Sequence, residues 1–189
     1  MNLNKVIVLL LVFISTSFSW KVSREAEKVW SGLSCLSSDD FMKEQPGRRI
    51  KTKTGRRTYQ ILEGFIYSGI SFKYEIEGKN VKYEVYAFMN PHKSWLREKD
   101  NLGTLDHEQG HFNITEIYAR KFRKKLVNLH RPADAQKYYR QLIEELEQKQ
   151  LDFDKDHLGE SGVEPKWRLW INNTLEDLNQ YTDHHLIPR

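Results

Sequence analysis

The chain of 189 residues lacks the features that staple small exported proteins or carry a chain through a membrane. Its single cysteine, Cys35, cannot form a disulfide within the chain. There is no internal repeat and no low-complexity tract. After residue 20, no stretch approaches the ~18 consecutive apolar residues of a membrane-spanning helix. The fold must therefore be held by packing, with or without a bound metal, and no stable membrane insertion is expected.

The first nineteen residues have the layout of a secretory signal peptide. Lys5 supplies a positive start, and the apolar run Val6–Ile14 is too short to span a bilayer of ~30 Å. Small residues then precede a cleavage site after Ser19. The sequence predicts a signal peptide over residues 1–19, one domain over 20–189, and export to the periplasm or the medium.

Charge gives little indication of a partner. The net charge of +4 falls to +3 when Lys5 leaves with the signal peptide. A basic segment, residues 48–57, could contact an anionic surface, but no nucleic-acid recognition motif accompanies it. A solvated segment is the favoured interpretation. We expect no nucleic-acid partner, and the oligomeric state is left open.

Hydrophobic periodicity predicts strands first and helices later. A period of two with aromatic and β-branched residues indicates strands, and a period of three to four indicates helices. The expected order is a short helix over Ala26–Leu36, a loop over Asp39–Arg57, strands over Tyr59–Leu62, Gly64–Ile76 and Val81–Met89, helices over Gly103–His130 and Ala133–Leu151, a polar loop over Asp152–Gly162, and a helix from Pro165. This order predicts an α+β fold with a small antiparallel sheet packed on helices.

Residues 106–112, DHEQGHF, contain the pattern H-E-x-x-H. Residues four apart lie about 40° apart around a helix, so His107 and His111 can both reach one small cation. Zinc prefers such nitrogen ligands, and Glu108 can reach water near the metal as a general base. Gly110 costs about 1 kcal/mol inside a helix, so a close approach of another element or of substrate is expected there.

A third protein ligand is expected for a catalytic zinc. Glu116 is rejected, because it lies about 140° around the helix from His111. His157, in the predicted polar loop, is the preferred ligand. Its rivals are glutamates of the following helix: Glu144, Glu145 and Glu147.

A longer run of residues resembles a known family. Ser94-Trp95, the core HEQGHF and the following I-x-E-I-Y-A-R over residues 114–120 are similar to a bacterial family of exported zinc-dependent proteases. That family is still named as a domain of unknown function and is grouped with the zincin metallopeptidases. The resemblance extends from Gly69 to the last predicted helix, which is most of the domain.

The resemblance implies a zincin-like fold and a zinc site. Family members also tend to carry an acidic segment that begins with Tyr and ends in His-Gly, ahead of a Trp-containing helix. Here Phe153 replaces the tyrosine and Leu158 the glycine, whereas Asp154, Asp156, His157 and Trp167 fit. Zincins usually hold an extended peptide along an edge strand beside the active-site helix, and Val81–Met89 is the expected strand.

These patterns predict a zinc-dependent metallopeptidase that hydrolyses peptide bonds of a peptide or protein substrate. Glu108 is the expected general base, and His107, His111 and His157 are the expected metal ligands. Tyr138 and Tyr139 could stabilise an oxyanion, but aromatic residues at helical spacing usually pack in a core. The alternative is a metal-binding interaction module that keeps the zincin scaffold without catalysis.

Overall fold

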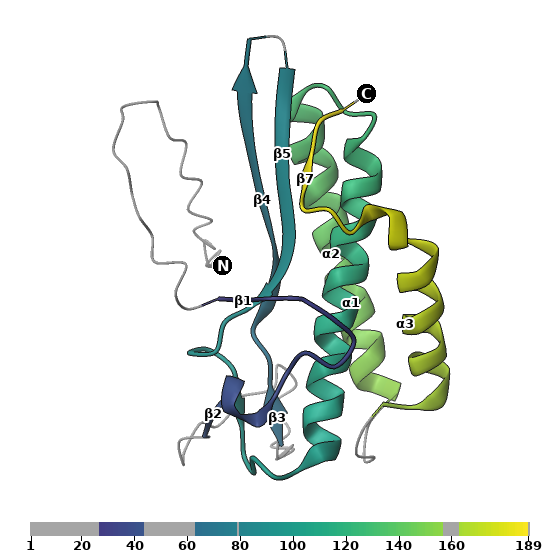
Figure 1. Ribbon diagram of the computed structural model, residues 1–189. Helices are drawn as coiled ribbons and strands as arrows, with labels where there is room; N and C mark the ends of the chain where they lie inside the picture. The colour runs from purple at the N-terminus through teal and green to yellow at the C-terminus, as the bar shows by residue number, and fades with distance from the viewer. Residues whose placement is uncertain (1–26, 44–62, 79, 157–162, 189) are drawn as a thin grey trace, which may run out of the picture.

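The structure is a computed structural model, and it describes residues 27–43, 63–78, 80–156 and 163–188. It is an α+β fold in which helices cover one face of a twisted sheet (Figure 1). The predicted signal peptide, most of the basic segment's loop, the strand Tyr59–Leu62 and His157 lie outside the described residues. No helix in the described part is long and apolar enough to cross a membrane.

The main sheet is built on one long hairpin. Strands β4 (Ser68–Glu77) and β5 (Asn80–Met89) pair antiparallel along ten residues each, as their alternation predicts. Gly78 has a φ of 63° in the connecting turn, a conformation that side chains with a Cβ rarely adopt. The β5 residues expected on one face are all buried: Val81, Tyr83, Val85, Ala87 and Met89.

Strand β5 is central, which corrects the expectation that Val81–Met89 is an edge. Its second edge pairs with β1 (Lys28–Val29) and with β7 (His185–Leu186). Between these two strands, the Val85 N–H donates to the His184 carbonyl at 2.8 Å and the Ala87 carbonyl accepts from the Trp30 N–H at 3.0 Å. An extended peptide therefore has no room to pair with β5.

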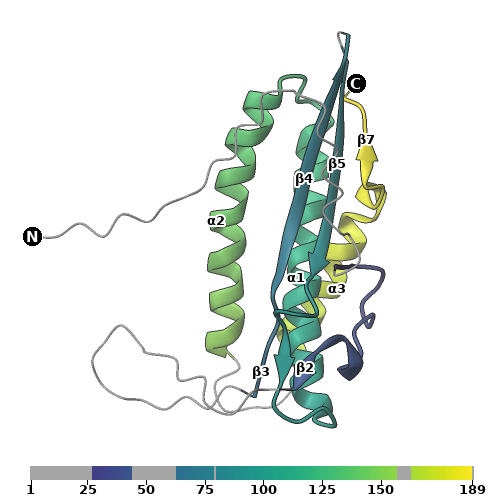
Figure 2. The same ribbon diagram turned by 90° about the vertical axis from the view of Figure 1, so that its left-hand side faces the viewer.

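Three helices follow the hairpin. Asn101 caps the N-terminus of helix α1 (Leu102–Leu126). Its side chain accepts a hydrogen bond from the Thr104 N–H at 3.1 Å. Helix α1 packs on β5 and on α2 (Pro132–Asp156), while α3 (Pro165–Asp177) covers another side of it (Figure 2). Because α2 runs back along α1, its last turns lie beside the first turns of α1.

Several boundaries differ from the sequence prediction. Helix α1 ends at Leu126 instead of His130, and the strand expected over Gly64–Ile76 is divided into β3 (Gly64–Phe65) and β4, which belong to different sheets. Helix α2 continues to Asp156 instead of ending at Leu151, because Phe153 is fully buried and keeps the apolar period going through a polar stretch. The segment expected as a helix over Ala26–Leu36 contains β1 and a turn in its described part. This segment forms no helix because its backbone pairs with β5 of the main sheet.

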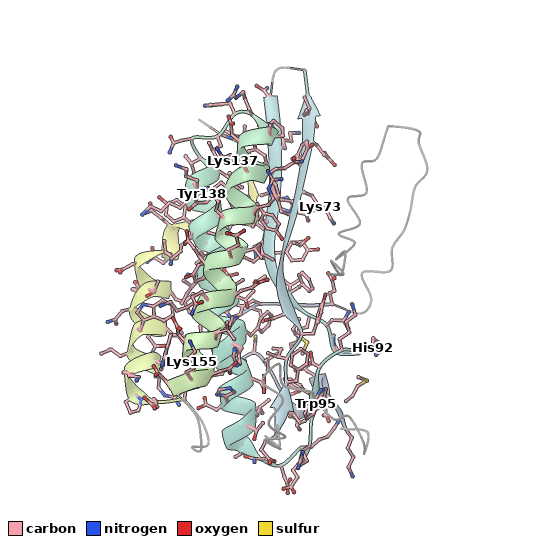
Figure 3. The ribbon with its side chains drawn as sticks, turned by 180° about the vertical axis from the view of Figure 1, so that it is seen from behind. Lys73, His92, Trp95, Lys137, Tyr138 and Lys155 are labelled. Atoms are coloured by element: carbon pink, nitrogen blue, oxygen red, sulfur yellow. The ribbon has the colours of Figure 1, made fainter. Side chains whose placement is uncertain are left out.

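Tyr138 and Tyr139 are partly buried and pack against the hydrophobic core. The Tyr139 ring packs on Phe72 and Phe122, and its hydroxyl donates to the Ile70 carbonyl at 2.7 Å. The Tyr138 ring lies 6.1 Å from that of Phe122. Figure 3 shows Tyr138 at one end of α2 and Lys155, the neighbour of Asp154, at the other. The packing interpretation is correct for both tyrosines.

A second, three-stranded sheet lies beside the start of α1. It is formed by β2 (Met42–Lys43), β6 (Trp95–Leu96) and β3 (Gly64–Phe65) in that order, with β6 in the centre. Among the described residues, β3 is an edge strand of this sheet. Helix α1 packs directly against it.

Candidate metal centre

His107 and His111 leave α1 on the side that faces the last turns of α2. Their Nε2 atoms are 3.1 Å apart. The Asp154 Oδ1 atom lies 2.8 Å from the His111 Nε2 and 3.3 Å from the His107 Nε2. Three donor atoms from two helices thus converge on one point. Among the described residues, they form a group that could hold a metal ion.

The spacing of these atoms fits a small cation. Ligand atoms at the usual zinc distances of about 2.0–2.1 Å lie roughly 3.3 Å from one another in a tetrahedral arrangement. The three separations here are 2.8, 3.1 and 3.3 Å. Two imidazole nitrogens and a carboxylate oxygen are also the ligand types that zinc takes. The donor set therefore suits the ion that the sequence predicts.

Electrostatics show that the cluster attracts positive charge. Burial alone would raise the Asp154 pKa, but hydrogen bonds and charges from His107 and His111 outweigh it and hold that pKa well below its usual range. Burial lowers the His111 pKa, yet Asp154 and Glu108 outweigh this and leave it raised. Without a metal, a proton on the His111 ring supplies the positive charge that Asp154 and Glu108 favour.

An aromatic ring forms the inner wall of the centre. Phe153 is stacked on the His107 ring at 4.9 Å and meets the His111 ring edge-on at 4.8 Å. A Cβ on Gly110 would lie 2.5 Å from the Phe153 Cζ. Gly110 therefore lets α2 approach α1 closely, which is the close contact that its place in a helix predicts.

Glu108 points toward β3 and not toward α2. A Cβ on Gly64 would lie 2.9 Å from the Glu108 Oε1, and the carboxylate accepts a bond from the Ile66 backbone. Burial raises the Glu108 pKa to about 7, helped by the Asp154 charge and opposed by His111 and the Ile66 bond. A carboxyl that titrates near neutral pH can both take and return a proton.

The remaining residues of the motif have structural roles. The Gln109 Oε1 accepts from the Leu36 N–H at 2.8 Å, and the Gln109 Nε2 donates to the Asn113 Oδ1 at 2.8 Å. Asn113 in turn accepts from the Trp30 indole at 2.8 Å. These bonds fasten the segment after β1 to the face of α1 opposite the histidines, so they keep the helix in place.

The structure brings His107 and His111 together with Asp154, which is the third ligand candidate among the described residues, whereas His157 lies outside them. Sequence reasoning missed Asp154 because it placed the end of the helix too early. The glutamates proposed as rivals do lie on α2, yet none belongs to the cluster: Glu144, Glu145 and Glu147. Glu116 instead forms ion pairs with Arg120 and Arg123, in line with its rejection as a ligand.

The comparisons with known proteins give one match. Residues 92–161 match the model of a family described as bacterial protein of unknown function (DUF922). This stretch holds α1, α2 and all three candidate ligands. No curated protein matches the chain, and no solved structure matches it.

Proposed function

We propose that this chain is an exported zinc-dependent metallopeptidase of the zincin type. The observation that carries the proposal is the convergence of the His107 Nε2, the His111 Nε2 and the Asp154 Oδ1 within 4.8 Å of one another. The buried carboxyl of Glu108, on the same helix, supports catalysis over metal storage alone. The match to a bacterial family is consistent with the proposal and names no activity.

Each residue has a separate task in this proposal. His107, His111 and Asp154 hold zinc, which would supply Lewis acidity toward water and the substrate carbonyl. Glu108 takes a proton from the water that attacks the peptide carbonyl and returns it to the departing amine. The Ile66 N–H fixes the Glu108 carboxylate in its place. Phe153 keeps water away from the inner side of the two imidazoles.

Strand β3 is the element best placed to hold a peptide. It is an edge in the described part of the chain, and its Gly64 lies against Glu108. An extended substrate that pairs with an exposed strand gains backbone hydrogen bonds without requiring a particular side chain. We propose that β3 takes the place that the sequence interpretation assigned to Val81–Met89.

Metal analysis of the purified protein tests the metal site. We expect about one zinc per chain in the wild type and almost none in a His107→Ala, His111→Ala double variant. A His130→Ala variant is the matched control, because His130 is an exposed histidine beyond the end of α1. Wild-type protein that binds no zinc from a zinc buffer would contradict the proposal.

Hydrolysis of a fluorescent casein by zinc-loaded protein tests catalysis. Glu108→Gln is expected to keep zinc and to lose at least 100-fold in rate, consistent with the roughly 10²–10⁴-fold that general bases contribute. Glu144→Gln removes an exposed carboxylate from α2 and should change neither zinc binding nor the rate of hydrolysis. Cleavage that survives Glu108→Gln would overturn the assigned role of Glu108.

A further inference from the structure

Gln150 lies on α2 one turn before Asp154 and contacts the metal-facing part of α1 through both ends of its amide. Its Oε1 lies 2.6 Å from the His111 Nδ1. Its Nε2 donates to the His111 backbone carbonyl at 3.0 Å and to the Thr115 Oγ1 at 3.1 Å. One side chain of α2 thus contacts the ring, the backbone and the next turn below His111.

These contacts define which way the amide points. The His111 carbonyl can only accept hydrogen bonds, so the amide NH₂ group must face it. A reversed amide would set its oxygen against that carbonyl oxygen at 3.0 Å, where two acceptors repel. The Oε1 atom therefore faces the ring, and the Nδ1 of His111 must carry the proton.

A proton on Nδ1 leaves the lone pair of the neutral ring on Nε2. That Nε2 is the atom that lies 3.1 Å from the His107 Nε2 and 2.8 Å from Asp154. A neutral imidazole with the other tautomer would point an N–H bond at the metal position and could not bind there. The choice of tautomer therefore decides whether His111 can act as a ligand.

We propose that Gln150 is a positioning residue that holds His111 in its metal-binding tautomer. This inference rests on the proposed zinc site and extends it to a residue that does not touch the metal. Thr115 supports the amide, because its hydroxyl also donates to the His111 carbonyl and lies 3.0 Å from the Ser68 hydroxyl on β4. A neutral amide orients the ring without adding a negative charge beside Asp154 and Glu108.

Zinc affinity, measured by competition with a chromophoric chelator, tests the proposal through two variants of equal length. Gln150→Met fills the same space and removes the acceptor, so the dissociation constant for zinc should rise roughly 10–100-fold, as for other outer-shell partners of metal-binding histidines. Gln150→Glu keeps an acceptor facing Nδ1 but sets its second oxygen against the His111 carbonyl, so it should bind zinc less tightly than wild type and still several-fold more tightly than Gln150→Met. Gln148→Met, an exposed change two residues away, should leave the affinity unchanged.

A role in packing alone predicts a different pattern, in which the Met and Glu variants bind zinc equally well. That result would overturn the inference while wild-type zinc binding kept the proposed function standing. Wild-type protein without zinc binding would instead refute the proposed function.

A measurement without any substitution gives a second test. Nitrogen-15 NMR of zinc-loaded wild type should show His111 bound to the metal through Nε2, with its proton on Nδ1. A proton on Nε2 would overturn the inference.

Discussion

Helix α1 carries two polar clusters, one buried and one partly open to solvent, that differ in how their charges are balanced. In the second half of the helix, Glu116 accepts bonds from Arg120 and Arg123. Other guanidinium N–H groups donate to backbone carbonyls: Arg120 to that of Leu175 at 2.8 Å and Arg123 to that of Val85 at 3.0 Å. Both arginines thus pair with the same Glu116 oxygen, Oε1, whereas the Glu116 Oε2 atom is buried without a hydrogen-bond partner among the described residues.

The cluster in the first half of α1 has the opposite balance. His107, His111, Asp154 and Glu108 bring acceptor groups together where the first turns of α1 meet the last turns of α2. Of these four side chains only Glu108 is buried, whereas the two histidines are half-buried and Asp154 is exposed. The comparison teaches that a closed ion-pair cluster supports the fold, whereas the acceptor-rich cluster has the composition of a group that could hold a cation.

The largest expected effect concerns the closed cluster. Glu116→Ala leaves Arg120 and Arg123 buried without an anion, and such a loss costs about 3–5 kcal/mol of folding stability. Urea unfolding followed by tryptophan fluorescence measures it. Glu144→Ala, on the exposed side of α2, is the control and should stay within about 0.5 kcal/mol of wild type. A similarly small change in Glu116→Ala would break the contrast between the clusters.

Zinc should stabilise the acceptor-rich cluster by a comparable amount. With free zinc at about 1,000 times its dissociation constant, a ligand that binds only the folded state adds about 4 kcal/mol. Asp154→Asn should lose most of that increment at the same free zinc. Asp152→Asn, at a half-buried carboxylate of the same helix outside the cluster, should keep it. Unfolding curves in zinc buffer and in EDTA give the difference, and an equal increment in Asp154→Asn would remove Asp154 from the ligand set.

Without zinc, the acceptor-rich cluster should make stability depend on pH through Glu108. Its folded pKa of about 7 exceeds the ordinary 4.5, so the stabilisation of its neutral form is complete below pH 4.5 and lost as pH rises to about 7. At about 1.4 kcal/mol per pKa unit, the loss is on the order of 3 kcal/mol. Urea unfolding in EDTA between these pH values should show it, and Glu108→Gln should flatten the dependence. A profile unchanged by Glu108→Gln would mean that other groups control it.

The sequence predicts the elements that depend on local patterns and misses those that depend on packing between elements. His107, Glu108 and His111 follow from the geometry of one helix, and the β4–β5 hairpin follows from alternation and its glycine turn. Asp154 was missed because residues 152–156 look polar, although Leu142, Leu146 and Phe153 keep a helical spacing that could have extended α2.

Other features have no local signal. The centrality of β5 depends on β1 and β7, which come from opposite ends of the chain. The contact of Gln150 with His111 joins residues 39 positions apart. Neither follows from periodicity or from motif spacing, because each requires knowing which elements become neighbours in space.

The smallest expected effect concerns the contact that brings α2 to the metal-facing side of α1. Gly110→Ala adds a methyl group 2.5 Å from the Phe153 Cζ, and overpacking of this kind costs about 1–3 kcal/mol. The higher helix propensity of alanine offsets about 1 kcal/mol of this cost, so the net loss of folding stability is about 1 kcal/mol. Gly32→Ala, where nothing lies within 4 Å, is the control. In a Phe153→Leu background, which removes the ring edge, the Gly110→Ala cost should largely disappear, as a double-mutant cycle on urea unfolding would show. A cost that persists in the Phe153→Leu background would place the clash at Val163, the other side chain near this position. It would then show that Gly110 is not needed for the contact with Phe153.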